Sequence, residues 1–435
     1  MMNKKIKLTF IGDLICHSDQ IEYAYNQNTR KYDFTPSFSK IKKYFSDSDY
    51  VIGNLETPLG GKDYQYSESR KGFSAPSEYL EALIDMDVDL FLTANNHCLD
   101  QGVAGLRQTL STLEAYGAEN TGTRISPKDG RFILKDIAGI KIAFINYTFG
   151  VNYNVHGCLP DNISDMVNIL SRPELQSFEE LWNRIPHFLT SSLLEKVACR
   201  NNTITKTSLS TIEEAIKTDI QDAKRLGADI VIVLPHAGVE FTDYPLHFMH
   251  NMVRQLSSYG ADIVIGGHPH VLQPMAFYDG GVDVSKKFVA YSLGNFITSD
   301  SSYWPSNKCM SSMILNLYLE MDSERKVKVT GVSVVPTYIE FNKQENCYQV
   351  CSLSDLIRYA NVVGEAEKYE RIQQRTLDLV TGNAVFEELG DEYYYDEDVA
   401  LPEIRVNYLY DIKSSLHYLC RIIKSLSRNI SNSGR

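Results

Sequence analysis

Residues 261–271 read ADIVIGGHPHV, and this stretch decides the fold class of the chain. Its first five residues are β-branched or apolar except for Asp262, and they end at two glycines. That pattern predicts a buried strand followed by a tight loop. His268 and His270 lie two positions apart on the loop, and Pro269 stiffens the backbone between them. Two imidazoles held in this way present nitrogen atoms to a metal ion at the edge of a sheet.

Four other apolar runs in the chain end in a similar way. Residues 6–11, 50–52, 90–93 and 230–234 resemble strands, and each is followed by a carboxylate, an amide or an imidazole. Because ligands bind at the carboxyl ends of the strands in open α/β sheets, we expect these side chains to gather at one site. One such residue alone is more typical of an ordinary loop. The coincidence over five strand ends, without cysteine, favours a site for Mn, Fe, Zn or Co.

The segments that carry these residues, taken in chain order, resemble the CapA family of capsule and poly-γ-glutamate synthesis proteins, a branch of the calcineurin-like metallophosphoesterases. The resemblance covers residues 5–340 and rests on six segments: 12–13, 54–56, 94–102, 236–240, 266–274 and 291–296. It implies an α/β fold, a four-layer α/β/β/α sandwich of two mixed sheets. It also implies two divalent metal ions and a hydrolase that acts on a phosphate ester or on an activated cell-envelope polymer precursor.

Site residues carry over by position from this resemblance. The implied metal ligands are Asp13, Glu56, Asn96, His236, His268 and His270. Glu56 would bridge the two ions, Asp13 and His270 would bind the first ion, and the other three residues would bind the second. His97 would face the substrate as a proton donor or charge stabiliser. Asp100 would orient the His97 imidazole, or would have only a loop role.

Three positions depart from the wider phosphoesterase pattern. Asp13 lacks the histidine that usually follows two positions later, so His17 is either a replacement ligand or a packed histidine. Glu56 stands where most phosphoesterases have aspartate, a feature that the CapA branch shares. Ala237 stands where the family commonly has tryptophan, which predicts a pocket that lacks one wall.

The composition predicts a large globular protein with an extensive core. The chain has 435 residues, of which 43% are hydrophobic and 23% charged. Its formal net charge of -12 argues against nucleic acid as a partner. For the same reason, an anionic small molecule or polymer precursor would have to be attracted by cations close to its binding site. The eight irregularly spaced cysteines predict reduced thiols. Because the sequence has neither a signal-peptide core nor an apolar run of membrane-spanning length, we expect a cytoplasmic protein, with peripheral contact to the inner membrane as an alternative.

Helical stripes before Gly117, Gly227 and Gly260 alternate with the strands, which predicts parallel βαβ units. Hairpins are expected for residues 132–134 with 142–145, and for residues 288–291 with 313–317. The CapA-like domain is expected to span residues 1–345. Its insertion, at residues 151–208, would either pack over one edge of the domain or shape the mouth of the site.

Residues 346–435 are expected to form a C-terminal helical extension. The acidic segment 387–398 predicts a solvated linker. Residues 405–428 combine an apolar stripe at helical spacing with basic residues, which is typical of a helix that packs on its own domain. Such a helix can also contact an anionic membrane or partner enzymes of capsule synthesis.

Two alternatives to the hydrolase stay open at this point. One is a non-catalytic capsule-assembly factor that binds polymer or partner enzymes. The weaker one is amide-bond chemistry on poly-γ-glutamate. His97 favours the enzyme, because a purely structural metal site gives no reason for an uncoordinated imidazole beside Asn96.

Overall fold

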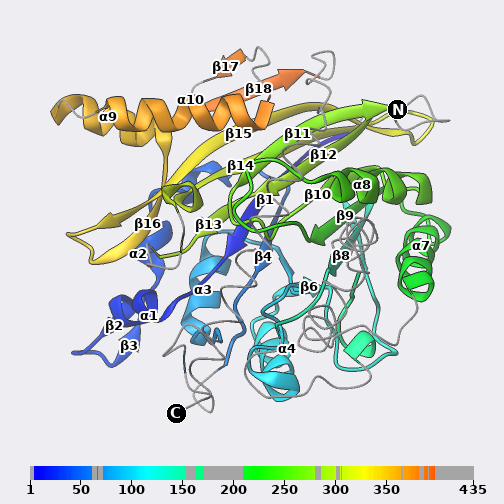
Figure 1. Cartoon of the computed structure of the whole chain (residues 1–435), viewed down its shortest axis with the longest axis horizontal. Coiled ribbons are helices and arrows are strands. Elements are labelled where there is room, and N and C mark those ends of the chain that lie inside the picture. Colours follow the sequence, from blue (N-terminus) through cyan, green and yellow to red (C-terminus); the bar gives the residue numbers. More distant parts are fainter. Residues whose placement is uncertain are drawn as a thin grey trace, which may run out of the picture.

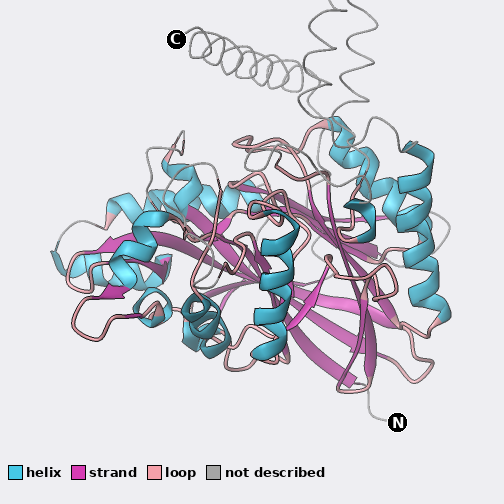
Figure 2. Cartoon of the chain, turned by 90° about the horizontal axis from the view of Figure 1, so that it is seen from below, coloured by secondary structure: helices cyan, strands magenta, loops and turns pink. Residues whose placement is uncertain are grey.

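The structure is a computed structural model, and it shows two stacked β-sheets with helices on both outer sides (Figure 1, Figure 2). The predicted α/β/β/α sandwich of two mixed sheets is confirmed, because one apolar core lies between the sheets and a second lies between the larger sheet and its helices. The described residues are 4–60, 66, 72–152, 163–170, 209–279, 286–299, 304, 306–363, 366–381, 387–389 and 391–396.

The larger sheet contains ten strands among the described residues. In spatial order they are β17 (Glu387–Leu389), β18 (Glu392–Asp396), β15 (Val327–Asn342), β14 (Ser311–Met321), β1 (Lys4–Leu14), β4 (Tyr50–Leu55), β5 (Leu90–Leu92) and β6 (Glu119–Thr121), with β13 (Asn295–Ile297) beside β1 and β16 (Cys347–Ser352) beside β15. The sheet is mixed: β1 runs parallel to β4 and antiparallel to β14.

The smaller sheet contains six strands among the described residues. In spatial order they are β11 (Leu272–Asp279), β12 (Lys286–Leu293), β10 (Ile263–Ile265), β9 (Ile230–His236), β8 (Ile140–Thr148) and β7 (Ile133–Ile137). The central strands β8, β9, β10 and β12 are parallel, and both edge strands are antiparallel to their neighbours. The hairpin predicted for residues 132–134 and 142–145 is β7 with β8 and is confirmed.

Helices cover the outer faces of both sheets (Figure 2). The helices in chain order are α1 (Ser18–Ala24), α2 (Thr35–Phe38), α3 (Ser77–Asp85), α4 (Gly102–Ala115), α7 (Leu209–Arg225), α8 (His247–Tyr259), α9 (Leu353–Val363) and α10 (Glu367–Thr381). The 3-10 turns are η1 (Lys42–Tyr44), η2 (Ile163–Asp165) and η4 (Asn307–Met310), and a small ribbon joins β2 (Tyr25–Asn26) to β3 (Lys31–Tyr32).

Side-chain periodicity explains how these elements pack. On β1, Ile6, Leu8 and Phe10 alternate along the strand and are buried in the core between the two sheets. Ile11 and Leu14 are buried in the second core, which the helices cover. A strand with both faces buried reads as a nearly continuous apolar run, as the sequence of β1 does.

The helical stripes end at glycines, as predicted. Leu106, Leu110 and Leu113 recur on one face of α4 and are buried. The chain leaves α4 through Gly117 with φ 66° and leaves α8 through Gly260 with φ 116°. Both values lie in the left-handed region, which glycine adopts without the steric cost of a Cβ atom.

One predicted hairpin is wrong. Residues 288–291 belong to β12 in the smaller sheet, whereas residues 313–317 belong to β14 in the larger sheet. The chain changes sheets at Gly294, whose φ is 72°, and then continues as β13 beside β1. The pattern of apolar residues identifies both strands but does not show this crossing.

The acidic segment 387–398 is not a solvated linker. Residues of this segment form β17 and β18, and β18 pairs antiparallel with β15. Its acidic side chains have partners in the body of the protein: Asp391 with Arg358, and Glu392 with Ser333. The predicted boundary at residue 345 also falls between two paired strands, β15 and β16. Helices α9 and α10 follow β16.

Most of the predicted insertion 151–208 and the whole amphipathic stripe 405–428 lie outside the described residues. Within the described part of the chain, each helix is too short or too polar to cross a membrane.

Candidate metal centre

The carboxyl ends of the parallel strands meet at one place, as the sequence predicts. Asp13 on β1 is level with Asn54 on β4 and with Asn295 on β13. In the smaller sheet, His236 at the end of β9 forms a bridge with Gly267, which follows β10. The site therefore lies across both sheets, and strand pairing fixes the positions of its backbone atoms.

Two groups of side chains at this place have the arrangement of metal ligands. The first group is Asp13, Glu56 and His270, and the second is Glu56, His236 and His268. Within each group the candidate ligand atoms all lie within 4.8 Å of one another, and every member is buried. Glu56 belongs to both groups, which is the arrangement that a bridging ligand requires.

Glu56 gives the clearest test of whether metal ions fit. Its side chain is 0% exposed, and neither carboxylate oxygen has a hydrogen-bond partner among the described residues. Its Oε1 atom lies 3.4 Å from His236 Nε2 and 3.8 Å from His270 Nε2. Because a buried carboxylate is costly unless cations or hydrogen bonds compensate it, this environment favours bound cations. Carboxylate with imidazole is a donor set for divalent transition metals, so the residues present fit such ions.

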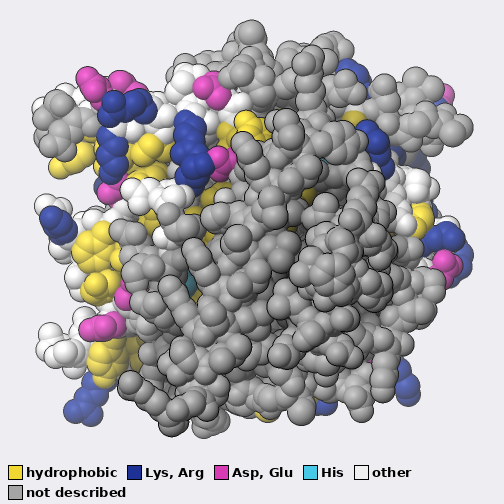
Figure 3. Space-filling model, viewed as in Figure 1, with side chains coloured by type: hydrophobic (Ala, Val, Ile, Leu, Met, Phe, Trp, Pro, Cys, Tyr) yellow, Lys and Arg dark blue, Asp and Glu magenta, His cyan; other side chains and the backbone are white. Residues whose placement is uncertain are grey.

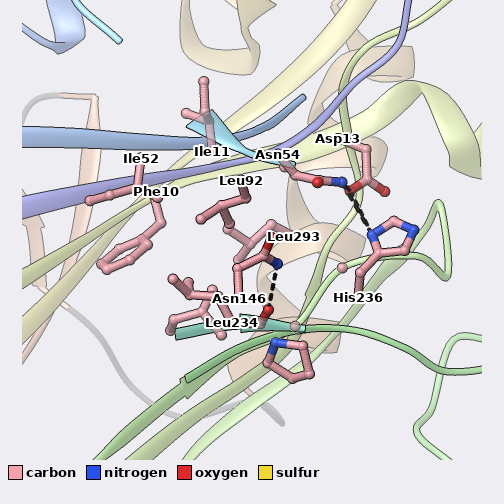
Figure 4. A pocket seen from close by; sticks show the side chains of 15 residues that line it. Phe10, Ile11, Asp13, Ile52, Asn54, Leu92, Asn146, Leu234, His236 and Leu293 are labelled. Atoms are coloured by element: carbon pink, nitrogen blue, oxygen red, sulfur yellow. Dashed lines mark hydrogen bonds and ion pairs between the residues drawn. The ribbon is translucent and has the colours of Figure 1, made fainter. Parts of the chain in front are cut away.

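Asn96 and Asn54 extend these groups. Asn96 Oδ1 lies 2.7 Å from His236 Nε2, the same nitrogen that faces Glu56. Asn54 Nδ2 donates to Asp13 Oδ1 at 2.8 Å and lies 3.2 Å from His236 Nδ1. Figure 4 shows Asp13, Asn54 and His236 pointing toward one another above apolar side chains such as Leu92. The cavity at this position is only about 20 Å³ and most of its lining is apolar, so the ligand residues lie against apolar side chains.

The backbone is strained at both histidines of the loop that follows β10. His268 has φ 98° and His270 has φ 58°, values that residues with a Cβ atom rarely adopt. Gly267 lies against the ligands, because a Cβ atom there would stand 2.9 Å from Asp13 Oδ1. The glycine thus allows the loop to approach Asp13, and the strain at both histidines is typical of a functional site.

The electrostatics of the groups favour positive charge. Burial lowers the pKa of His270, but the carboxylates of Glu56 and Asp13 outweigh burial and raise it to about 10. Burial raises the pKa of Asp13, yet its hydrogen bond with His270 and the nearby His236 lower it overall. The same negative field attracts any other cation to this position.

His97 and Asp100 form a pair beside the two ligand groups. His97 Nδ1 lies 2.6 Å from Asp100 Oδ2, which also accepts a hydrogen bond from the Phe73 backbone N–H at 2.8 Å. Burial lowers the pKa of His97, but Asp100 outweighs it and raises the pKa above 6.5. Its Nε2 atom lies 3.9 Å from Glu56 Oε1, and 18% of the side chain is exposed. His97 is therefore in neither ligand group, while its ring lies between Glu56 and solvent.

His17 belongs to neither ligand group. Its Nδ1 atom lies 2.8 Å from Ser299 Oγ, and its ring contacts Phe73 and Trp304. Burial, followed by the neighbouring His97 and His270, lowers the pKa of His17 to about 3. Of the two alternatives for His17, the structure therefore gives the packed and neutral histidine.

The site has aromatic walls although position 237 is alanine. Ala237 is fully buried. The ring of Trp304 lies 5.0 Å from that of His270, and the Phe241 ring stacks at 6.0 Å from the same imidazole. Phe73 stacks on His97 at 4.2 Å. These aromatic side chains thus come from segments that are distant from one another in the sequence.

Sequence reasoning missed these rings and three supporting amides. Besides Asn54, they are Asn95, whose Nδ2 donates to Leu55 O, and Asn295, whose Oδ1 lies 2.9 Å from His270 Nδ1. Such a contact fixes the orientation of an imidazole and leaves its other nitrogen for a ligand. These amides stand at strand ends beside predicted ligands, and this position in the sequence could have identified them. No periodicity marks the aromatic residues.

The geometry defines an α/β sandwich with a buried carboxylate–histidine site, and comparison with known proteins gives its family. Residues 7–300 match the family described as bacterial capsule synthesis protein PGA_cap. Because this match spans more than half of the chain, the protein belongs to that family, and the resemblance to the CapA family is confirmed.

Two relatives agree with this assignment. The PGA biosynthesis protein CapA of Bacillus subtilis (strain 168) is 25% identical over 339 residues, 76% of this chain and 73% of that protein. The capsule biosynthesis protein CapA of Bacillus anthracis is 25% identical over 299 residues, 68% of this chain and 60% of that protein. The structure of the calcineurin-like phosphoesterase YfkN from Bacillus subtilis covers 86% of this chain and 97% of its own, with 14% identity and a TM-score of 0.40.

Proposed function

We propose that this protein is a metal-dependent hydrolase of capsule or cell-envelope polymer synthesis, acting on a phosphate ester or an activated polymer precursor. The observation that carries the proposal is Glu56: a fully buried carboxylate that has no hydrogen-bond partner in the described part of the chain and is shared by two groups of ligand atoms. Asp13 and His270 would hold one divalent ion with Glu56. Asn96, His236 and His268 would hold the other.

The residues around this site have distinct roles in the proposed reaction. Two divalent ions, when bound, would supply Lewis-acid stabilisation of phosphoryl oxygens and activation of water. His97, held by Asp100 at 2.6 Å and partly exposed, would donate a proton to the leaving group. Phe73, which stacks on His97, would keep the imidazole in place and exclude water from one side.

The arrangement of His97 favours an enzyme over a non-catalytic assembly factor. A structural metal site needs only its ligands, yet here an imidazole outside both ligand groups has its own buried carboxylate partner. Titratable groups with shifted pKa values, such as this pair, cluster at functional sites. Binding to other enzymes of capsule synthesis stays a further part of the proposal.

The test is metal analysis of the protein purified without chelator, followed by a screen of phosphate mono- and diesters with Mn, Fe, Zn and Co. We expect close to two ions per chain and hydrolysis of at least one ester class. The His97→Ala variant should keep the ions and lose the hydrolysis, and His268→Ala with His270→Ala should lose both. A protein that holds two ions but hydrolyses none of the esters above the rate of the His97→Ala variant would instead support the assembly factor.

A further inference from the structure

A second pocket lies next to the candidate metal centre. It is bordered by α10, by η4 and by the segment after β9, and its volume is about 430 Å³, within the usual range for small-ligand sites. Val271, which lines it, directly follows His270. Asp243, also in the lining, lies two residues after Phe241, whose ring stacks on His270. The pocket and the metal centre therefore share two loop segments.

The lining of this pocket carries more positive than negative charge. Lys308, Lys368 and Arg375 line it, and Asp243 is its one acidic residue among those described. Asp243 is shared, because Lys308 pairs with its Oδ2 atom and Arg375 Nη2 lies 3.5 Å from the same oxygen. Lys368 lies 2.9 Å from Glu340, just outside the lining. Even with Glu340 counted, the cations exceed the acids, in a chain whose formal net charge is -12.

The three cations are accessible and held in position. The side chains of Lys308, Lys368 and Arg375 are 35%, 54% and 52% exposed. Lys368 Nζ lies 4.6 Å from the ring centre of Tyr369 and 5.4 Å from that of Tyr338, so cation–π contacts restrict its position. In Figure 3, Lys and Arg side chains stand beside hydrophobic side chains over the region of α9 and α10.

One face of α10 contributes several residues to the lining of this pocket. Lys368, Ile372, Arg375 and Leu379 all line the pocket, and their spacing of four, three and four residues places them on the same side of the helix. The apolar members of this face give a ligand hydrophobic contact, while the charged members fix its orientation.

We propose that this pocket is an anion-binding site that takes a ligand bearing carboxylate or phosphate groups beside apolar carbon. A purely structural role would use the ion pairs to close α10 onto the sheet, whereas here the cations surround an open cavity and two of them share one carboxylate. Helix α10 follows the family-matched residues 7–300, so the C-terminal part of this chain supplies Lys368 and Arg375 to a pocket that Asp243 and Val271 also line. The proposal does not depend on the hydrolase activity, because it concerns binding at residues that are not metal ligands.

The test measures binding of two probes, tricarballylate and inorganic phosphate, to the full-length protein by titration calorimetry at low salt. The variant Lys368→Gln with Arg375→Gln removes two cations from the pocket. Its matched control, Arg225→Gln with Lys326→Gln, removes two exposed cations elsewhere, where side chains are 76% exposed. We expect the Kd of at least one probe to rise about tenfold or more in the pocket variant and less than about twofold in the control. The probe that responds identifies carboxylate or phosphate as the preferred group.

Two further variants keep the result interpretable. Lys368→Arg with Arg375→Lys keeps both charges, so it should fold and bind within about threefold of the parent. His268→Ala with His270→Ala disables the metal centre and should leave binding at the pocket. Three results would each overturn the proposal. The first is equal affinity of the pocket variant and the control for the probes, and the second is no binding of either probe to the parent. The third is binding that is lost only when both histidines are replaced.

Discussion

Replacing Glu56 by glutamine should remove both metal ions at once, because Glu56 is common to the two ligand groups. The change keeps the size of the side chain and removes its charge. His268→Ala and His270→Ala each remove a ligand of one group, so each should leave one ion. The matched control is Glu240→Gln, which removes a carboxylate that influences His270 but lies in neither group.

The size of the effect follows from this sharing. Each ion that binds only the folded chain stabilises it by about 2.7 kcal/mol when free metal is about 100 times Kd. Two bound ions therefore stabilise the parent by about 5 kcal/mol. Either histidine variant should keep about half of this stabilisation, and Glu56→Gln should keep almost none. With an unfolding entropy of about 2.1 cal/mol/K per residue, each ion raises the Tm of a cooperatively unfolding chain of 435 residues by about 3 °C.

The assay combines elemental analysis after dialysis against Mn²⁺ or Zn²⁺ with thermal unfolding in metal and in chelator. We expect two ions in the parent and in Glu240→Gln, one in each histidine variant, and none in Glu56→Gln. A Glu56→Gln protein that keeps one ion, or whose Tm rises in metal as much as that of the parent, would refute the bridging position of this carboxylate.

His97→Ala should lower turnover by about 10²–10⁴-fold, and metal analysis alongside kinetics should find its ions unchanged; equal loss of metal would make it a ligand instead. Gly267→Ala should weaken metal binding at least about tenfold, because the new Cβ would stand 2.9 Å from Asp13 Oδ1. Unchanged affinity in a metal titration would show that the loop moves to accommodate the added methyl group. Arg358 lowers the pKa of Asp391 below its ordinary 3.8. Their ion pair therefore contributes its full stabilisation above pH 3.8, and this stabilisation is lost as the pH falls through the lower pKa of Asp391 in the folded protein. The protection of β18 amides against hydrogen exchange, corrected for the intrinsic pH dependence of exchange, should therefore fall below about pH 4 in the parent and change less in Asp391→Asn; an equal change of protection in both would show that this pair does not hold the strand.

The predicted ligands came together because their signals are local. An apolar run that ends at glycine or at a polar residue is visible within ten positions, and parallel pairing then brings such ends to one edge of a sheet. Asp13 and Asn54 are paired across β1 and β4 in this way, and His236 and Gly267 are bridged in the smaller sheet. The stacking of two sheets, which places the two pairs face to face, has no local signal and was available only from the resemblance to a family.

What the sequence did not predict depends on contacts between distant residues. The acidic segment after residue 386 looks solvated by composition, yet Asp391 pairs with Arg358 and Glu392 accepts a hydrogen bond from Ser333. The change of sheet at Gly294 depends on one left-handed residue between two similar apolar runs. Likewise, Trp304 reaches His270 from a segment that has no periodicity of its own.

The C-terminal part of the chain is bound into the fold that carries the metal centre, although it follows the family-matched residues. Leu377 and Val380 of α10 and Tyr393 of β18 are buried in the same apolar cluster as Phe10 of β1. Strands β16 and β18 both pair with β15, so without them that strand would expose unpaired backbone groups at an edge. Helix α10 also supplies two of the three cations of the anion pocket, and the pocket shares the segment after β10 with His270. Metal ligands from the family-matched residues and pocket residues from the C-terminal part therefore lie on one continuous folded unit.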